Sequence, residues 1–332
     1  MREFSIQSRD AGKRLDRWLS QELPALPMGL MQKFIRLKRV KINGKAAQRD
    51  ARLAEGDVLQ LYLNDEYFEK PRSIDPFLSK LHPRLSIVFE NEHVLLVDKR
   101  PGLITHPDEH EKVNTLLTHA RAYLYQKGEY DSMTPGAFAP ALCNRIDRFT
   151  GGIVILAKTE QAMHILNRKI REREVEKRYL CIVHGRVNPP SGLLDNAILK
   201  QQGQKRVTVL DHDVPDAQRA QTRYRTLACR DGLSLMECEL LTGRTHQIRA
   251  QFAHLRHPLL GDNQYGDPRL DKRYHRHYQA LYAYRLDFRF TSDAGVLAPL
   301  NGRSWQVNDV AFVREYFPEF AADPLLSPSN PQ

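Results

Sequence analysis

The sequence predicts an α+β protein: a mixed, mostly antiparallel central sheet with flanking helices, preceded by a small N-terminal α/β domain. From residue 85 onward, apolar or alternating runs of strand length follow one another without a helix after each of them. The first 63 residues instead place apolar side chains at helical spacing. With 332 residues, of which 41% are hydrophobic, the chain can form one large core and a small appended domain.

Residues 1–63 predict a self-contained unit of two helices and a short sheet. Apolar residues recur at helical spacing over 15–23 and again over 30–37. An alternating segment at 40–45 contains an Asn-Gly turn signal, and 58–63 predict a closing strand. A unit of this size is too small to be an independent enzyme.

Residues 64–80 lack periodicity and contain two prolines, which indicates a linker. The larger domain is expected over 81–322, and the tail at 323–332 is expected to be disordered. In the larger domain the strands are expected at 85–89, 94–97, 153–156, 179–183, 206–210, 222–228, 233–241 and 281–290, and the helices at 115–125, 159–173 and 245–256.

The charge distribution favours a polyanionic partner. Fifty Lys and Arg residues against forty Asp and Glu residues give a net charge of +10. Residues 1–60 hold 13 basic and 7 acidic residues, so most of the excess lies there. A cluster of five cations could follow a phosphate backbone, although an ordinary solvated surface explains it about as well. Because the cluster lies on a small two-helix unit, we expect it to bind RNA; its members are Lys33, Arg36, Lys38, Arg39 and Lys41.

Several classes of protein are not expected. The sequence has no run of about 18 apolar residues, so we expect no membrane span, and its start does not resemble a secretory signal. Four cysteines without CxxC spacing indicate thiols in the cytoplasm. The pairs His106/His110 and His254/His257 lack a completing acid or cysteine, so no metal is expected. No phosphate-binding or dinucleotide motif indicates a cofactor.

The segment Asn-Arg-Ile-Asp-Arg-Phe-Thr-Gly-Gly at 144–152 places a carboxylate at the mouth of a buried strand. Arg145 and Arg148 bracket Asp147, and neighbouring guanidinium groups favour the ionised form that a nucleophile or base requires. The alternative is an aspartate that only stabilises a turn, and the residue types alone favour that alternative.

A second polar segment runs from Leu241 to Asp262 and contains Thr-Gly-Arg-Thr-His-Gln-Ile-Arg. A helix starting near Thr245 would have an apolar face and a cationic face. Arg244 precedes that helix, where a turn can aim it at an anion. For Arg249 and Arg256 we expect plain surface or phosphate contacts. The cationic face comprises His246, Arg249, Ala253 and Arg256.

These segments, in this order and together with Glu176-Lys-Arg-Tyr179-Leu, resemble the RluA-type pseudouridine synthases along nearly the whole chain. The N-terminal unit is similar to the small RNA-binding domain of the ribosomal protein S4 type. The resemblance implies a mostly antiparallel sheet of eight strands with a cleft across its middle. It also implies a reaction without cofactor or metal.

The resemblance further implies roles for particular residues. Asp147 matches the essential aspartate, and Tyr179 matches the tyrosine that stacks on the target base and reaches its proton. Arg244 matches the basic residue that pairs with the aspartate. RNA contacts are expected from Arg145, Arg148, His246 and Arg249. Where the commoner family pattern has histidine, aspartate and histidine, this sequence has Asn144, Phe149 and Tyr282, which bears on the choice of target.

We therefore expect an enzyme that isomerises uridine in structured RNA, with large-subunit ribosomal RNA first and transfer RNA second as substrate. A non-catalytic RNA-binding or ribosome-assembly factor is one alternative. A nucleoside or glycoside hydrolase that pairs Asp147 with Asp98 or Asp262 is another. The protein is expected to be a cytoplasmic monomer without an obligate protein partner.

Overall fold

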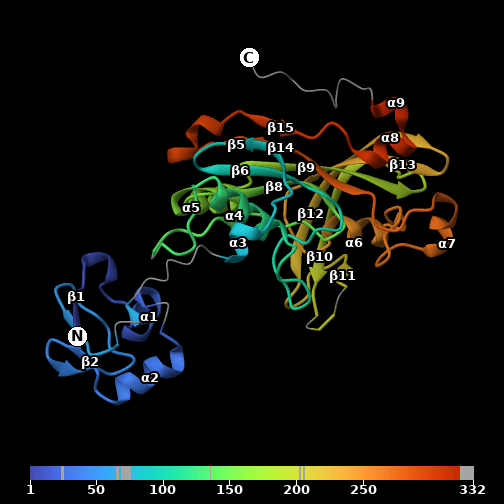
Figure 1. Cartoon of the computed structure of the whole chain (residues 1–332). Coiled ribbons are helices and arrows are strands. Elements are labelled where there is room, and N and C mark those ends of the chain that lie inside the picture. The colour runs from blue at the N-terminus through green and yellow to red at the C-terminus, as the bar shows by residue number, and fades with distance from the viewer. Residues whose placement is uncertain are drawn as a thin grey trace. The chain divides into compact units, whose positions relative to one another are not determined.

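The computed structural model describes residues 1–23, 26–64, 67–68, 76–134, 136–201, 203–204 and 206–321. The chain forms two compact units, one of residues 1–80 with 125–137 and the other of 81–124 with 138–332 (Figure 1). The expected tail at 323–332 lies outside the described residues, as do 65–66 and 69–75 of the expected linker. The described end of that linker holds a short helix, α3 (Pro76–Lys80).

The N-terminal unit has the two expected helices and the expected closing strand. Its four-stranded sheet has the order β1-β4-β2-β3. Trp18 and Phe34, one from each helix, lie in its buried apolar cluster. Strand β1 was not expected and pairs antiparallel with β4. The elements are β1 (Arg2–Ser5), α1 (Leu15–Glu22), α2 (Met28–Arg36), β2 (Val40–Ile42), β3 (Lys45–Ala46) and β4 (Val58–Leu61).

The larger unit is built on one sheet with eleven strands among the described residues, three more than expected, and β7, β11 and β15 are only two or three residues long. The main path is β11-β10-β12-β13-β9-β14-β8-β6-β5, with β15 beside β14 and β7 beside β8. Its described pairings are antiparallel except that of β14 with β8. The strands are β5 (Ser86–Glu90), β6 (Val94–Lys99), β7 (Ala141–Leu142), β8 (Gly151–Ala157), β9 (Val175–His184), β10 (Ser191–Leu199), β11 (Thr208–Leu210), β12 (Gln218–Arg230), β13 (Leu233–Leu240), β14 (Leu281–Phe288) and β15 (Ser304–Gln306).

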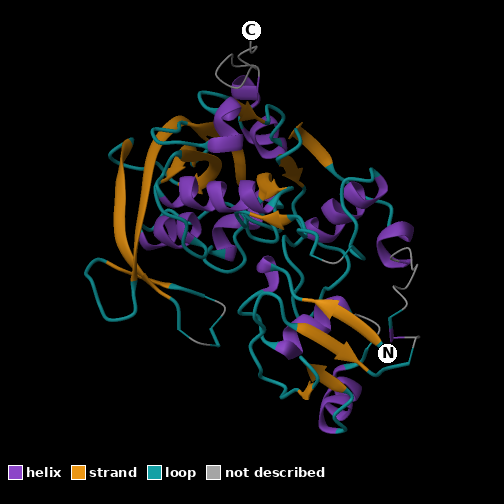
Figure 2. Ribbon diagram, turned by 90° about the vertical axis from the view of Figure 1, so that its left-hand side faces the viewer, coloured by secondary structure: helices purple, strands orange, loops and turns teal. Residues whose placement is uncertain are grey.

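Helices cover parts of this sheet and bury its apolar side chains (Figure 2). Helix α5 begins where the Thr159 hydroxyl caps the Ala162 N–H, and its Leu166 packs in one cluster with β6 and β8. Phe312 of α8 packs in a second cluster with β9 and β13. No helix in the described part of the chain is both long and apolar enough to cross a membrane. The helices are α4 (Leu116–Gln126), α5 (Glu160–Arg171), α6 (Gln247–His254), α7 (Pro268–Asp271), α8 (Ala311–Tyr316) and α9 (Pro318–Ala321).

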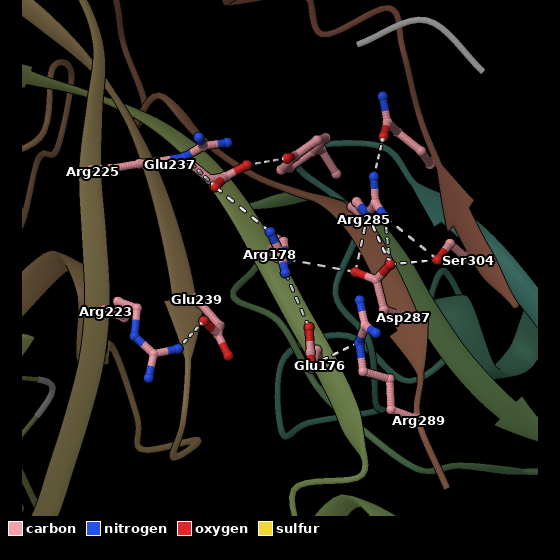
Figure 3. A network of polar contacts seen from close by, with 12 residues as sticks. Glu176, Arg178, Arg223, Arg225, Glu237, Glu239, Arg285, Asp287, Arg289 and Ser304 are labelled. Carbon is pink, nitrogen blue, oxygen red and sulfur yellow. Dashed lines mark hydrogen bonds and ion pairs between the residues drawn. The ribbon is translucent and has the colours of Figure 1, made fainter. Parts of the chain in front are cut away.

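Side chains alternate between the two faces of β9, and the two faces differ in chemistry. Glu176 and Arg178 lie on the face shown in Figure 3, where arginines cover acids of neighbouring strands. There Arg178 lies 3.5 Å from Asp287 and 3.9 Å from Glu237. Because the acids are already paired with arginines, this face forms a network of ion pairs. Lys177 and Tyr179 belong to the other face of the strand.

Candidate active site

A cavity of about 580 Å³ opens on the face of the sheet that carries Lys177 and Tyr179. Residues from three segments line it, at 104–108, at 143–148 with 150, and at 243–249, the last of which reaches into the first turn of α6. All three expected catalytic residues, Asp147, Tyr179 and Arg244, lie around this one cavity although they are distant in sequence. Its size falls within the range of about 300–1,000 Å³ usual for ligand sites.

Asp147 lies in the loop that leads into β8, with 26% of its side chain exposed. Of the two bracketing arginines, Arg145 is exposed at the cavity, and Arg148 donates from Nε to the Gly102 carbonyl over 3.1 Å. The Arg148 carbonyl accepts a 3.0 Å hydrogen bond from the fully buried Lys99 ammonium. Burial lowers the pKa of Lys99 to about 7, although the charges of Asp147 and Asp98 act to raise it. These contacts fix the backbone beside Asp147.

Arg249 is the guanidinium that holds Asp147. Its Nη1 donates to Asp147 Oδ2 over 2.7 Å. Its Nε and Nη2 donate to the two oxygens of Asp262 over 2.7 and 2.8 Å, and Nη2 also donates to Gln264 over 3.0 Å. Burial alone would lower the pKa of Arg249, but the hydrogen bonds and charges of the two aspartates raise it. Arg249 therefore stays charged and bridges the half-buried Asp147 carboxylate to the buried Asp262 carboxylate.

The expectation that Arg244 pairs with Asp147 is wrong. Arg244 is exposed on the rim of the cavity, and its Nε donates to the Arg219 carbonyl over 3.1 Å. The expectation of surface or phosphate contacts for Arg249 is also wrong, because only 6% of this residue is exposed. Two arginines five positions apart along the chain thus exchange the roles that the sequence suggested.

Helix α6 lacks the exposed cationic face that its sequence predicts. Gln247 and Gln251 are 2% and 1% exposed, and their amides bond to the neighbouring strands. Gln247 donates to the Gln221 carbonyl over 3.0 Å, and Gln251 donates to the Ala220 carbonyl over 3.0 Å. Because glutamines can satisfy carbonyl groups inside the protein, a polar helix can be buried on both faces. Arg249 is carried into the interior with them.

His246 stands at the N-cap of α6 in the left-handed conformation, with φ at 53°. Its Nε2 lies 3.9 Å from Asp147 Oδ1, and its Nδ1 lies 3.0 Å from the Tyr265 hydroxyl. Burial lowers the pKa of His246, and the charge of Asp147 opposes that effect. His246 is therefore a wall residue beside the carboxylate rather than an exposed cation.

Tyr179 and Lys177 form the floor of the cavity. Tyr179 is 5% exposed, and burial together with the charge of Asp147 raises the pKa of its phenol. Burial lowers the pKa of Lys177. Lys177 was not among the residues expected at the site, although its position two residues before Tyr179 on a strand places both side chains on one face. Gln264 and Tyr265 were not expected either, because they lie in a loop and give no periodic signal.

The departures from the commoner family pattern have local structural partners. The Asn144 side chain accepts the Ile155 N–H over 2.7 Å, which ties the loop to β8. The Tyr282 hydroxyl donates to Asp98 over 2.6 Å, and a Cβ added at Gly151 would lie 2.4 Å from its ring. Glycine at 151 is thus needed where the Tyr282 ring packs. Phe149 is 41% exposed.

The hydrolase alternative would need Asp98 or Asp262 as a second carboxylate beside Asp147, and neither fills that place in the cavity. Asp262 is 2% exposed, and its two oxygens are bonded to Arg249. Burial raises the pKa of Asp98, and its Tyr282 hydrogen bond opposes this. Asp98 lines a separate cavity with Arg84. The geometry therefore does not favour the two-carboxylate alternative.

The basic cluster of the N-terminal unit lies at the end of α2 and the start of β2. Lys33, Arg36, Lys38 and Arg39 are exposed, and Lys41 is half-buried. Two of these cations rest on aromatic rings of the same unit, Arg39 at 5.6 Å from the Phe34 centroid and Lys41 at 5.1 Å from that of Tyr62. The N–H groups of the exposed cations in this cluster can contact an anionic surface.

The chain is also similar to known proteins. A family model described as RNA pseudouridylate synthase matches residues 93–254, and an S4 domain model matches residues 13–59. The chain is 30% identical to an uncharacterized RNA pseudouridine synthase of Mycoplasma genitalium, over 86% of this chain and 88% of that protein. It is also 30% identical to the ribosomal large subunit pseudouridine synthase D of Nitrosomonas europaea, over 89% of this chain and 82% of that protein.

Among solved structures, the human RNA pseudouridylate synthase domain containing 1 matches with a TM-score of 0.50 at 23% identity. The match covers 64% of this chain and 81% of that chain, and it supports the fold alone. The expected α+β fold class is confirmed. The family match, the S4 domain and the extended similarity to whole relatives agree, so the chain belongs to the RluA-type family of RNA pseudouridine synthases and is an enzyme that isomerises uridine in RNA.

Proposed function

We propose that Asp147 is the catalytic carboxylate and that it acts on a uridine flipped into the 580 Å³ cavity. The ion pair with Arg249 carries this proposal, because it holds an ionised carboxylate at the cavity in one orientation. The other oxygen, Oδ1, lies 3.9 Å from His246 Nε2, which is beyond hydrogen-bonding distance, so in this proposal it is the oxygen that meets the sugar. An oriented anion in a partly buried site is the arrangement that nucleophilic or base catalysis requires.

Isomerisation breaks the bond from the ribose C1′ to the uracil N1 and forms a bond from C1′ to C5. The C5 proton leaves and N1 gains a proton, so atoms and charge balance without a co-reactant. Asp147 can attack C1′ or remove a ribose proton, and both routes begin from the same ionised carboxylate. Extracting the base from its stack costs a few kcal/mol, which contacts to the flipped base and the phosphates must offset.

Tyr179 supports the base in this proposal. Its ring on the cavity floor offers a stacking surface worth about 1–3 kcal/mol. Because burial and the charge of Asp147 raise its pKa, the phenol stays protonated near neutral pH. Tyr179 therefore presents a ring and a protonated O–H group. It can accept a proton from the substrate only if it donates its own proton at the same time.

We further propose that the substrate is large-subunit ribosomal RNA, with transfer RNA as the alternative. Curated relatives carry the name ribosomal large subunit pseudouridine synthase, which supports the first choice. The exposed cations of the N-terminal unit, together with Arg145, Arg148 and Arg244 at the cavity, would contact phosphates. We also propose that the protein acts as a monomer in the cytoplasm; its four free cysteines fit that reducing compartment.

The catalytic proposal is tested with Asp147→Asn and, as the matched control, Asp108→Asn, which changes an exposed acid of the same cavity in the same way. Purified proteins are incubated with in vitro transcribed ribosomal RNA and transfer RNA, and pseudouridine is mapped. We expect Asp147→Asn to form none while binding RNA as the unchanged protein does. Turnover by Asp147→Asn would refute the catalytic role, and conversion of transfer RNA alone would refute the ribosomal substrate.

The N-terminal contribution is tested by changing Lys33, Arg36 and Lys38 together to Gln. Each lost phosphate contact should reduce the slope of log affinity against log salt by about 0.7–0.9. The same substitutions at Arg2, Arg9 and Lys45 would be the charge-matched control. A slope that falls equally in both variants would mean that the cluster has no special contact with RNA.

A further inference from the structure

Two stacked aromatic rings, one of them in the loop that lines the catalytic cavity, have no role in the proposed chemistry. Phe149 follows the cavity-lining Arg148, and its ring lies 5.8 Å from that of Tyr278, with 17° between the ring planes. Phe149 is 41% exposed. A side chain this exposed contributes little to a core, so packing does not explain why a large apolar residue stands two positions after Asp147.

Each ring of the pair has a guanidinium beside it. The Arg148 guanidinium carbon lies 5.5 Å from the Phe149 centroid, and that of Arg276 lies 5.0 Å from the Tyr278 centroid. Arg276 also lies 5.3 Å from the Phe312 ring of α8. Both arginines are anchored by backbone carbonyls, of Gly102 and Tyr278 respectively. The rings are therefore pre-oriented, so a planar ligand can bind without first ordering them.

We propose that the Phe149–Tyr278 pair is a binding site for a second nucleobase of the RNA, the immediate neighbour of the target uridine. This inference rests on the proposed function and adds to it a determinant of target choice. Two residues of chain span at most about 7 Å, so Phe149 lies within the reach of a nucleotide adjacent to one held at Asp147. Flipping the uridine deprives its neighbour of a stacking partner, and an exposed ring replaces that partner.

The proposed base-binding site depends on having a phenylalanine at position 149. The commoner family pattern has aspartate at that position, and a carboxylate would repel the phosphates of the strand and offer no ring. The exposed Arg148 guanidinium beside the Phe149 ring adds attraction for the same phosphates, whereas Arg276 is already paired with Glu315 at 3.5 Å. A base of any identity has a π face, so the site favours an unpaired neighbour over a particular sequence.

The test uses an RNA stem-loop that contains the uridine modified by the unchanged protein. The nucleotide next to this uridine is either an ordinary nucleotide or an abasic one. Phe149→Ala should raise KM for the ordinary stem-loop by about 5- to 150-fold, which corresponds to one stacking contact of about 1–3 kcal/mol. Phe149→Leu keeps the apolar volume without a ring and should behave like Phe149→Ala, whereas Phe149→Trp should restore KM. Leu270→Ala, which removes an apolar side chain that is 45% exposed elsewhere on the unit, is the control.

The abasic stem-loop separates stacking from a structural effect. Its KM with the unchanged protein should rise by the same factor, and Phe149→Ala should add no further loss, because the two changes remove one contact. The proposed base-binding site would be overturned if the abasic residue and Phe149→Ala raised KM by factors that multiply. It would also be overturned if Phe149→Ala and Phe149→Leu left KM unchanged. Turnover of the ordinary stem-loop by the unchanged protein is measured first, so failure of the proposed function is seen before Phe149 is tested.

Discussion

Replacing Arg249 by lysine keeps the positive charge and removes the fork that joins two carboxylates. In the structure, Asp147 and Asp262 are bonded to different nitrogens of one guanidinium, at 2.7 Å for Asp147 and at 2.7 and 2.8 Å for Asp262. An ammonium group offers its donors from a single point, so it cannot keep the bidentate contact with Asp262 while also reaching Asp147. Arg249→Lys should therefore reduce both stability and turnover.

The magnitude follows from the contacts that are lost. Hydrogen bonds to charged groups contribute about 1.5–3 kcal/mol each, and breaking a buried pair costs about 3–5 kcal/mol. With Asp262 only 2% exposed, we expect a loss of about 3–5 kcal/mol in the free energy of unfolding. At about 2–4 °C per kcal/mol for a unit of this size, Tm should fall by about 6–20 °C. Loss of the Asp147 contact should lower kcat about 10- to 150-fold.

Arg244→Lys is the matched control, because the sequence favours Arg244 and the structure favours Arg249 as the partner of Asp147. Arg244 is exposed, and its Nε bonds to a backbone carbonyl. Its substitution should change stability by no more than about 0.5 kcal/mol. Any loss of activity should appear in KM, since the contact with Asp147 is intact.

Both variants are measured by thermal unfolding and by initial rates of pseudouridine formation at saturating RNA, at a temperature where each is folded. A kcat for Arg249→Lys close to that of the unchanged protein would refute the reasoning. So would a larger fall in kcat for Arg244→Lys than for Arg249→Lys, because that would restore the role predicted from the sequence.

Other predictions concern the stability of the larger unit. Lys169 is fully buried and donates to Glu174 over 2.6 Å, so Lys169→Met should cost about 3–5 kcal/mol in unfolding experiments, and the double variant with Glu174→Gln should recover part of it. Hydrogen bonds from Lys169 and Thr291 lower the pKa of Glu174 to about 2. The ionised carboxylate therefore adds its full share to the free energy of unfolding above pH 4.5, and this share is lost as the pH falls towards 2. In Glu174→Gln, the free energy of unfolding should depend less steeply on pH between these two values. Gly152→Ala would place a Cβ 2.2 Å from the Ala283 carbonyl oxygen, so it should lower Tm far more than Gly302→Ala, where φ is also positive but nothing lies within 4 Å.

Much of the fold follows from local patterns. The eight strands expected in the larger domain are present, because alternating and continuous apolar runs report a buried sheet directly. Strand β10 was missed, since the side chains of Ser191–Leu199 are mostly exposed or half-buried and include Asp195 and Asn196. The helices after 260 were missed because α7, α8 and α9 are only four to six residues long.

The family of the enzyme and the position of Asp147 in its cavity could be read from the sequence, because three motifs recur in a fixed order. Which arginine holds Asp147 could not be read, since helical spacing defines the faces of α6 without saying which face is buried. The fold decides this by burying Gln247 and Gln251 against strand carbonyls and by returning Asp262 to Arg249 from 13 residues further along the chain. Residue order thus determines which chemical groups are present, and only long-range packing determines which of them share one hydrogen-bond network.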